Sequence, residues 1–444
     1  MNNEPKAMVF RHATILTEND KQHVITDGAL AFEGTAITYV GQDSALPKRY
    51  ASFEQLDCSD CLLLPSFTNC HTHTGMVAFR SLGDDFADRL RRFLFPLERT
   101  CMTKELAKAS AALAIAEMQL AGIGRAVDMY YYEQDIAKLA EQMHFSLFCG
   151  ETIMEESPCN CTTAEQAIAY GKDIPNGSFV HRMYAAHAPY NATSEHLKAL
   201  QALAKDEQTR WTMHLSEMDF EMEHYASTYG MTPIAYLDSQ GLLDEHLLAV
   251  HCIHTTDDDL RLLAKRDVAV VHCPVANAKS AKGVARVHEM LKMGIPVCLG
   301  TDGPASGNSL DLFTQMRLCT ILQKNAQGDR SLLPATEVVP MVTSVAARVL
   351  GMEKSSGSLE VGKDADILVL GLTKPNMQPC FDPYSVVVYS AGVQNVRHLF
   401  TKGSWVVRDH RLAYADEKQL RLRFQQAATG FYAEAQRLLQ VKEL

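Results

Sequence analysis

Short apolar stretches alternate with longer stretches rich in Ala, Leu and Met through the middle of this chain. The longer ones, such as Lys104 to Ala121 and Ser194 to Lys205, predict helices, and the short ones predict strands that are buried on both faces. The predicted strands are residues 62–65, 126–129, 146–149, 182–185, 211–214, 248–251, 268–271 and 297–299. About eight strand–helix units over such a length fit an α/β fold of the (β/α)8 TIM-like barrel type, with its helices outside.

Both ends of the chain are instead rich in short β-type stretches. The first 60 residues read as strands separated by polar turns, and strands return after Gly357, among them Ser385–Tyr389. The simplest prediction is a small β-sandwich domain formed from both chain ends, residues 1–61 with 365–417. It stands beside a catalytic barrel of residues 62–364, and residues 418–444 predict a C-terminal amphipathic helix.

The net charge and the cysteine content indicate which binding partners and which cellular compartment to expect. The chain has 42 Lys and Arg against 53 Asp and Glu, a net charge of −11, which argues against nucleic acid and anionic membranes as partners. No stretch approaches the roughly 18 apolar residues of a membrane span. Met1–Lys6 has no signal-peptide stretch behind it, and the 12 cysteines are scattered, so we expect free thiols and a cytoplasmic location.

Polar residues follow four of the predicted strands. His71 and His73 come after the run at 62–65, and alternate residues of an extended segment face the same way. His214 and His251 end their strands, and Asp302 follows the strand at 297–299. In a barrel, the carboxyl ends of all strands open onto one mouth, so we expect these five side chains to converge there.

Three imidazoles and a carboxylate suit Zn²⁺ or Fe²⁺, and such a site keeps a position open for water. The metal lowers the pKa of that water from about 16 towards about 7. The alternative is that each histidine is an ordinary core residue, which the joint pattern disfavours. Glu217, three residues beyond His214, suits a proton shuttle, although it could instead cap the next helix.

The segments Pro65–His73, His214–Glu217, His251–His254 and Leu299–Gly303 resemble those of the amidohydrolase superfamily. They look most like its branch of 5′-methylthioadenosine/S-adenosylhomocysteine deaminases, whose relatives deaminate guanine, pterins and triazines. The resemblance covers nearly the whole chain and includes the closing segment at 357–366.

The resemblance implies a role for each residue of the site. One metal would be held by His71, His73, His214 and Asp302. Asp302 would also take the proton of the metal-bound water, Glu217 would protonate the substrate ring, and His251 would orient the hydroxide. The segment Tyr184–Tyr190 lacks the bridging lysine of binuclear members, so the expected cofactor is one divalent metal, with Zn²⁺ preferred and Fe²⁺ the alternative.

The substrate pocket is less certain from sequence. Glu98 resembles the glutamate that grips the ribose hydroxyls, and a carboxylate can accept both bonds of a vicinal diol, although Glu98 could also be an exposed helix residue. Glu98, His187 and Glu217 are the predicted substrate-binding residues. The chain departs from adenosine-type members in lacking a Trp at 91–95, in having Glu151 where a cation is usual, and in reading Ala276–Lys279 for Ser-Asn-Ala-Lys.

These observations predict a metal-dependent hydrolytic deaminase of a purine nucleoside, of the 5′-methylthioadenosine, S-adenosylhomocysteine or adenosine type, or of a similar amino-heterocycle. The alternatives are an aminohydrolase of a free heterocycle (guanine, 8-oxoguanine, a pterin or a triazine), a hydrolase of another C–N or a C–Cl bond, and a non-catalytic barrel. The expected partner is a small heterocyclic substrate, and a homo-oligomer is implied only by the family.

Overall fold

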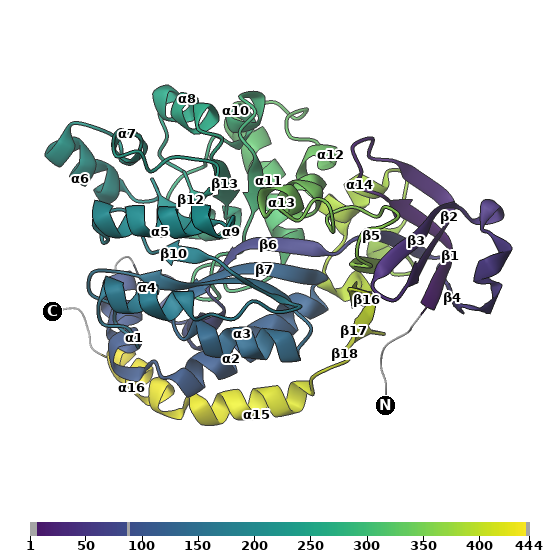
Figure 1. Cartoon of the computed structure of the whole chain (residues 1–444), viewed down its shortest axis with the longest axis horizontal. Helices are drawn as coiled ribbons and strands as arrows, with labels where there is room; N and C mark the ends of the chain where they lie inside the picture. Colours follow the sequence, from purple (N-terminus) through teal and green to yellow (C-terminus); the bar gives the residue numbers. More distant parts are fainter. Residues whose placement is uncertain (1–6, 87–88, 441–444) are drawn as a thin grey trace.

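The computed structural model describes residues 7–86 and 89–440 and contains two separate sheets (Figure 1). In one of them every pairing between strands is parallel. Its strands are β6 (Phe67–Thr72), β7 (Ile123–Tyr130), β8 (Ser146–Ile153), β10 (Tyr184–Ala186), β11 (Trp211–Leu215), β12 (Leu247–His251), β13 (Ala269–His272) and β14 (Val297–Leu299), with β9 (Val180–Arg182) beside β8. The predicted barrel is thereby confirmed.

Hydrogen bonds between the first and last strands nearly close this barrel. The Asp302 N–H donates to the carbonyl of His71 at 3.1 Å, and the Thr301 N–H donates to Oδ1 of Asn69 at 3.0 Å. The Asn69 amide nitrogen in turn donates to the Thr301 hydroxyl at 2.7 Å. The loop after β14 is therefore fastened to β6, next to the predicted metal ligands.

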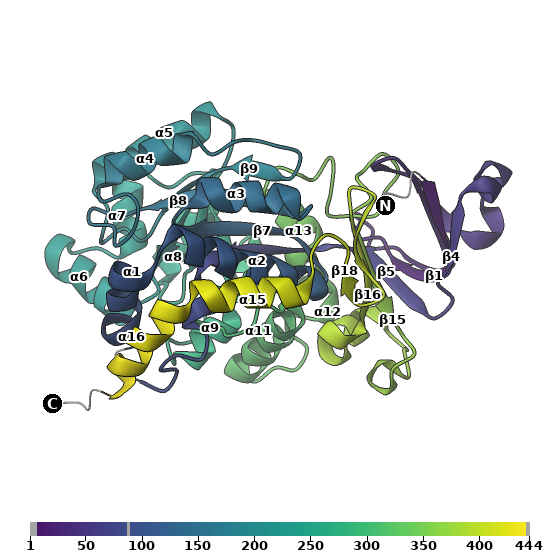
Figure 2. The ribbon, with the colours of Figure 1, turned by 90° about the horizontal axis from the view of Figure 1, so that it is seen from below.

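Helices surround the barrel and follow its strands in sequence (Figures 1 and 2). The main ones are α2 (Lys104–Leu120), α3 (Glu133–Gln142), α4 (Ala164–Lys172), α5 (Ser194–Asp206), α6 (Asp219–Tyr229), α7 (Pro233–Ser239), α8 (Asp257–Lys265), α9 (Pro274–Lys279), α10 (Val287–Lys292), α11 (Leu312–Gln327) and α13 (Ser344–Val349). Threonine hydroxyls cap the first turns of α2, α4, α5, α7 and α8, which explains where these helices begin. Among the described helices, none is both long and apolar enough to cross a membrane.

The two chain ends build the second sheet, which is mixed. Its strands are β1 (Ala7–Leu16), β2 (Val24–Glu33), β3 (Ala36–Gln42), β4 (Glu54–Asp57), β5 (Cys61–Pro65), β15 (Ile367–Gly371), β16 (Val396–Thr401), β17 (Ser404–Arg408) and β18 (Arg411–Leu412). β5 lies between β1 and β15 and so joins the two ends. A β domain formed from both ends is thus confirmed, whereas the domain boundaries at 61, 364 and 417 stay a prediction.

Two strand predictions are wrong. Residues 62–65 were expected in the barrel, but they belong to β5 of the mixed sheet, and the first barrel strand is β6. A run that is apolar throughout fits a strand buried on both faces in either sheet, so its composition cannot distinguish the two.

The second error concerns Ser385–Tyr389, which is helical. α14 (Pro383–Ser385) continues directly into a π-helical turn, η7 (Val386–Ser390). The Asp382 carboxylate accepts the Tyr384 N–H at 3.0 Å, and Pro383 occupies the first turn. This Asp-Pro start, together with burial of the valines, overrides the strand preference of β-branched residues.

The chain ends in two helices, α15 (Glu417–Ala427) and α16 (Thr429–Gln440), where a single helix from Lys418 was predicted. Residues 441–444 of that prediction lie outside the described residues. In Figure 2, α15 runs along the barrel beside α2, and α16 reaches α1 (Phe95–Cys101). The C-terminal segment thereby connects the mixed sheet to the opposite end of the barrel.

Candidate active site

The five predicted side chains meet at the carboxyl ends of the barrel strands. Nε2 of His71 lies 3.2 Å from Nε2 of His214, and Nε2 of His73 lies 3.3 Å from Oδ1 of Asp302. Oδ1 of Asp302 also lies 3.9 Å from Nε2 of His71. The potential ligand atoms of His71, His73 and Asp302 lie within 4.8 Å of one another, and so do those of His71, His214 and His251. Side chains from the end of β6, from β11, from β12 and from the loop after β14 therefore form one cluster, in which all but the half-buried His73 are buried.

The backbone around this cluster adopts a conformation that side-chain-bearing residues rarely use. Ser216, His251, Cys252 and Asp302 have φ angles of 50°, 74°, 45° and 58°. Residues held in this left-handed region concentrate at functional sites, because the surrounding structure must compensate for the strain. Here they lie where β11 and β12 end and where the chain leaves β14.

The protonation states of the cluster suit a divalent cation. Burial, and then the neighbouring imidazoles, hold the pKa of His71 and of His214 well below the usual range, so both rings are neutral. For His73, burial lowers the pKa, but the hydrogen bond and charge of Asp302 outweigh burial and raise it. Burial raises the pKa of Asp302, but His73 outweighs it and the net pKa lies well below the usual range.

Metal ligation requires neutral imidazoles and an ionised carboxylate. His71 and His214 are already neutral, Asp302 is ionised, and a cation would displace the proton that Asp302 favours on His73. Nδ1 of His73 lies 2.6 Å from the carbonyl of Met129, which points Nε2 of the ring toward Asp302. The four residues thus fit a nitrogen- and oxygen-bound Zn²⁺ or Fe²⁺.

Glu217 lies against His251 beside the cluster. Its Oε1 is 3.5 Å from Nε2 of His251 and forms an ion pair with Nζ of Lys282. Burial raises the pKa of Glu217, but the charges of His251 and Lys282 outweigh it, so the net pKa is lowered. Nδ1 of His251 is in turn held by Oδ1 of Asn277 at 3.0 Å.

Glu217 does not cap the next helix, since the N-cap of α6 is Met218 and no side chain caps it; the preceding loop is instead held by Glu221 in the first turn of α6. Its carboxylate accepts the backbone N–H of Ser216 at 2.9 Å and that of Glu217 at 3.0 Å. The Glu217 side chain is therefore left to face His251 and Lys282.

The two other predicted substrate residues line the same site. Glu98 is 6% exposed, so it is not a surface residue of its helix, and it accepts the Tyr130 hydroxyl at 2.8 Å. The Tyr130 ring centroid lies 6.4 Å from that of His73. The His187 ring, which follows β10, lies 5.0 Å from the His214 ring and is held by the Asn191 amide at 2.8 Å. Their substrate-binding roles stay predictions.

Glu151 has a local structural use. Its carboxylate accepts the N–H of Glu133 at 3.0 Å and of Tyr132 at 3.4 Å, at the start of α3, and the residue is 3% exposed. A carboxylate at a helix N-terminus is favourable, since it satisfies orphan N–H groups there. Glu151 is thus engaged with α3.

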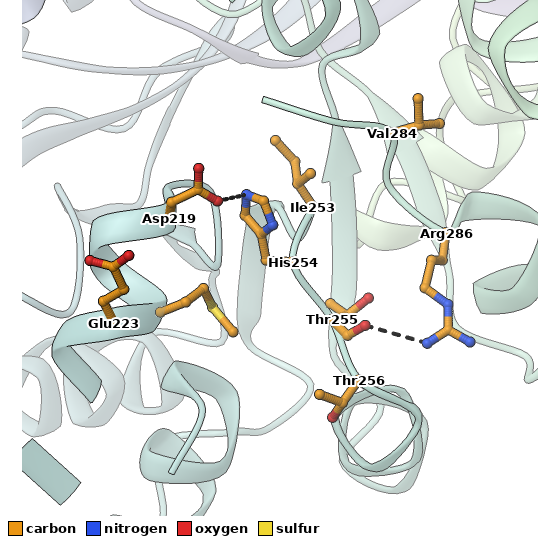
Figure 3. A pocket seen from close by; sticks show the side chains of 9 residues that line it. Asp219, Glu223, Ile253, His254, Thr255, Thr256, Val284 and Arg286 are labelled. Carbon is orange, nitrogen blue, oxygen red and sulfur yellow. Dashed lines mark hydrogen bonds and ion pairs between the residues drawn. The ribbon is translucent and has the colours of Figure 1, made fainter. Parts of the chain in front are cut away.

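A pocket of about 640 Å³ lies next to the Glu217 segment (Figure 3). Its walls come from the start of α6, from residues 253–256 after β12, and from Val284 and Arg286. Asp219 and His254 approach to 3.4 Å on one wall, while Arg286 donates to the Thr255 carbonyl at 3.3 Å on the other. Because these walls follow β11 and β12, the pocket opens at the same end of the barrel as the histidine cluster.

Sequence reasoning missed Lys282, Asn277, Tyr130 and Asn191 as neighbours of the site. Asn277 lies in the Ala276–Lys279 segment, but its contact with His251 was not predicted. The other three belong to no motif of closely spaced polar residues and reach the site only through the fold. A lysine in the loop after α9 carries no signal in the sequence that links it to Glu217.

Comparison with known proteins agrees with the predicted family. Residues 62–406 match the amidohydrolase family. A 5-methylthioadenosine/S-adenosylhomocysteine deaminase of Syntrophus aciditrophicus is 34% identical over 412 residues, covering 91% of this chain and 93% of that protein. A 5′-deoxyadenosine deaminase of Methanosarcina acetivorans is 30% identical, covering 96% of this chain and 99% of its own length.

Among solved structures, a zinc-bound adenosine deaminase from Xanthomonas campestris superposes with a TM-score of 0.93 at 27% identity, covering 97% of this chain and 99% of that one. The match of fold, length and sequence extends over both the barrel and the mixed sheet. The chain therefore belongs to the amidohydrolase family.

Proposed function

We propose that this protein is a divalent-metal-dependent aminohydrolase that replaces the exocyclic amine of an adenosine-type purine nucleoside with a carbonyl and releases ammonia. The observation that carries the proposal is the buried cluster of His71, His73, His214 and Asp302 with Glu217 beside it. Relatives named as deaminases of adenosine derivatives, aligned over nearly their full length, support this substrate class.

One cation would be held by His71, His73, His214 and Asp302, and Zn²⁺ is the ion we propose, with Fe²⁺ as the alternative. When bound, such an ion acts as a Lewis acid and lowers the pKa of water from about 16 towards about 7. The zinc in the related adenosine deaminase structure supports this choice of ion, and the lack of a lysine in residues 184–190 supports a single ion.

The residues of the chain divide the proton transfers between them. Glu217, which is ionised, takes up one proton of the attacking water and delivers it to the ring nitrogen adjacent to the attacked carbon. Asp302 accepts the second proton of that water and passes it to the departing amine, so that ammonia leaves as the carbonyl forms. His251, whose Nδ1 is fixed by Asn277, directs its Nε2 toward Glu217 and the reacting oxygen. Glu98 accepts hydrogen bonds from the ribose diol, and His187 contacts the substrate.

A free heterocycle is the second candidate, and one observation favours it. Glu151 is engaged with α3, and the third strand carries no cation at the place where adenosine-type members have one. Recognition of a guanine, 8-oxoguanine, pterin or triazine would depend less on a cation at that position of the substrate pocket. Hydrolysis of another C–N bond or of a C–Cl bond remains the alternative within the same chemistry.

A substrate panel distinguishes these candidates. We expect the zinc-loaded protein to release ammonia from adenosine, methylthioadenosine or adenosylhomocysteine, with Glu217→Gln as the control of strongly reduced activity. Release only from guanine, 8-oxoguanine, a pterin or a triazine would select the second candidate, and no release from any compound would reject deamination.

Metal content forms a separate test. We expect elemental analysis of fully active protein to give one divalent ion per chain, and chelation to abolish activity until the ion is restored. Two equivalents in a fully active preparation would contradict the single-ion site.

We also propose that the enzyme acts in the cytoplasm on a small molecule, without nucleic acid or membrane as partner, and assembles as a homo-oligomer. The free state of the 12 cysteines supports a reducing compartment. The assembly is proposed from the family alone.

A further inference from the structure

One lysine reaches the interior of the site from a loop that carries no recognised motif. Lys282 lies between α9 and α10, and its side chain is 22% exposed. Its ammonium pairs with Oε1 of Glu217, whose side chain is 13% exposed. A poorly hydrated ammonium is costly unless it is paired, so this contact fixes both side chains.

Lys282 closes a ring of contacts around the proposed proton-transfer groups. Its backbone N–H donates to the carbonyl of Asn277 at 3.1 Å. Oδ1 of Asn277 is hydrogen-bonded to Nδ1 of His251, and Nε2 of His251 faces Glu217. Glu217 in turn pairs with the ammonium of Lys282. The short segment formed by α9 and the loop after it therefore contacts both His251 and Glu217.

The other cationic side chains near this segment are paired with carboxylates other than Glu217. Lys279, three residues before Lys282, pairs with Asp84 at 2.8 Å, and Arg286 pairs with Asp257 and Glu289. Among the described residues, Lys282 and His251 are the basic groups within ion-pair distance of Glu217. The position of the Glu217 carboxylate thus depends on these two contacts.

We propose that Lys282 is a positioning residue: its ammonium holds the Glu217 carboxylate beside His251, in the orientation from which Glu217 transfers a proton at the substrate ring. This inference rests on the proposed function of Glu217. Because Lys282 acts through Glu217, its removal should slow turnover and leave the metal ligands intact.

The test compares Lys282→Met with Lys282→Arg and with Lys292→Met, an exposed lysine at the end of α10. With the best nucleoside of the panel, we expect Lys282→Met to lower kcat by about 10- to 100-fold, the scale of a misplaced catalytic group, with KM and metal content close to the parent values. Lys282→Arg should recover most of the loss, and Lys292→Met should match the parent. If Lys282→Met does not fold, Lys282→Gln takes its place with the same expectation.

A double-mutant cycle separates positioning from general stability. In the Glu217→Gln background, Lys282→Met should lower kcat no further, because the group that it positions is already lost. An equal loss in both backgrounds, or a parent-like kcat in Lys282→Met, would overturn the proposal.

A crystal structure of zinc-loaded Lys282→Met gives a readout that does not depend on activity. We expect the Glu217 carboxylate to leave its place beside His251, and an unchanged Glu217 would count against the proposal. If the parent protein releases no ammonia from any compound, the proposed function fails, while this structure still decides the role of Lys282.

Discussion

At the scale of single residues, charge and burial assign different tasks to the carboxylates of the site. Asp302 is ionised beside His73, Glu217 is ionised beside Lys282 and His251, and burial raises the pKa of Glu98 to about 7. An ionised carboxylate can accept a proton, whereas a group that titrates near neutrality changes its hydrogen bonding with pH. The three carboxylates therefore differ in charge as their proposed roles of metal ligand, proton carrier and substrate contact require.

Glu217→Gln tests the proton carrier. The amide keeps the shape of the side chain but cannot take up the proton, so we expect metal content to be unchanged and kcat to fall by about 10²–10⁴, the usual scale of general acid–base catalysis. Elemental analysis and steady-state kinetics on the same preparation measure both quantities. Full activity would remove Glu217 from the mechanism.

Glu98→Ala tests the ribose contact. We expect kcat/KM for a nucleoside to fall by the loss of a charged hydrogen bond, about 1.5–3 kcal/mol each, while the matching free base, which has no diol, is affected far less. The metal content should stay the same. Equal losses on the nucleoside and the base would refute the ribose role.

The pH dependence of binding provides a second measure of the same contact. Because burial raises the pKa of Glu98 to about 7, the carboxylate is ionised above that pH and protonated below it. KM for the nucleoside should therefore rise about tenfold from pH 8 to pH 6, following the ionised fraction, and Glu98→Gln should abolish this dependence. A parent profile that is flat over this range would contradict the assignment.

How well sequence predicted the site depended on local spacing. His71, His73, His214, His251 and Asp302 could be found because each lies at or just after the carboxyl end of an apolar strand, and these ends meet in a barrel. Topology therefore predicted that these side chains converge, whereas the choice of His71, His73, His214 and Asp302 as metal ligands came from the family resemblance. Lys282 and Tyr130 could not be found, because their contacts with Glu217 and Glu98 span 65 and 32 residues of the chain.

At the scale of elements, alternation of strands and helices predicted the barrel, but composition alone could not assign each apolar run. β5 and β6 are separated by Ser66 alone and are buried throughout, yet they belong to different sheets. At η7, an Asp-Pro helix start outweighed the strand preference of three valines. Pairing partners and helix caps, rather than hydrophobicity, decided both cases.

The C-terminal helix α16 supports the segment that carries Glu98. Phe431 of α16 is 2% exposed, and its ring packs edge-on against Phe79 at 4.7 Å, six residues after His73. α16 also contacts α1, the helix of Glu98 (Figure 2). Loss of this packing should therefore make the position of α1 and Glu98 less well defined before it disturbs the metal ligands.

Phe431→Ala tests this support. We expect the docking of α16 to weaken by about 3 kcal/mol, as for a buried Phe truncated in a core, with a higher KM for the nucleoside and unchanged metal content. Tyr432→Ala is the matched control, because Tyr432 is the next residue in sequence and is 43% exposed. Thermal unfolding and kinetics on nucleoside and free base measure the effects; a parent-like KM would show that α16 does not support the Glu98 wall.

At the scale of the whole molecule, the two sheets are joined by a buried ion pair. Arg125 on β7 of the barrel is 2% exposed, and its guanidinium donates to Asp366 at 3.0 Å and to the Ser356 hydroxyl at 2.9 Å. Asp366 precedes β15 of the mixed sheet and also accepts the Ser356 hydroxyl at 2.8 Å and the Lys402 N–H at 2.9 Å. The contact between the two sheets is thus a network in which these polar groups are hydrogen-bonded to one another.

Removing one member of this network should destabilise the fold more than any exposed ion pair does. Asp366→Asn leaves the Arg125 charge buried without a carboxylate, so we expect the free energy of unfolding to fall by about 3–5 kcal/mol. Asp238→Asn, which breaks the pair with the exposed Arg266, should cost far less, because solvent screens that pair. Adding Arg125→Met to Asp366→Asn removes the unpaired charge and should restore part of the loss. Chemical denaturation of the metal-loaded proteins measures all three, and equal effects of Asp366→Asn and Asp238→Asn would show that this ion pair does not hold the two sheets together.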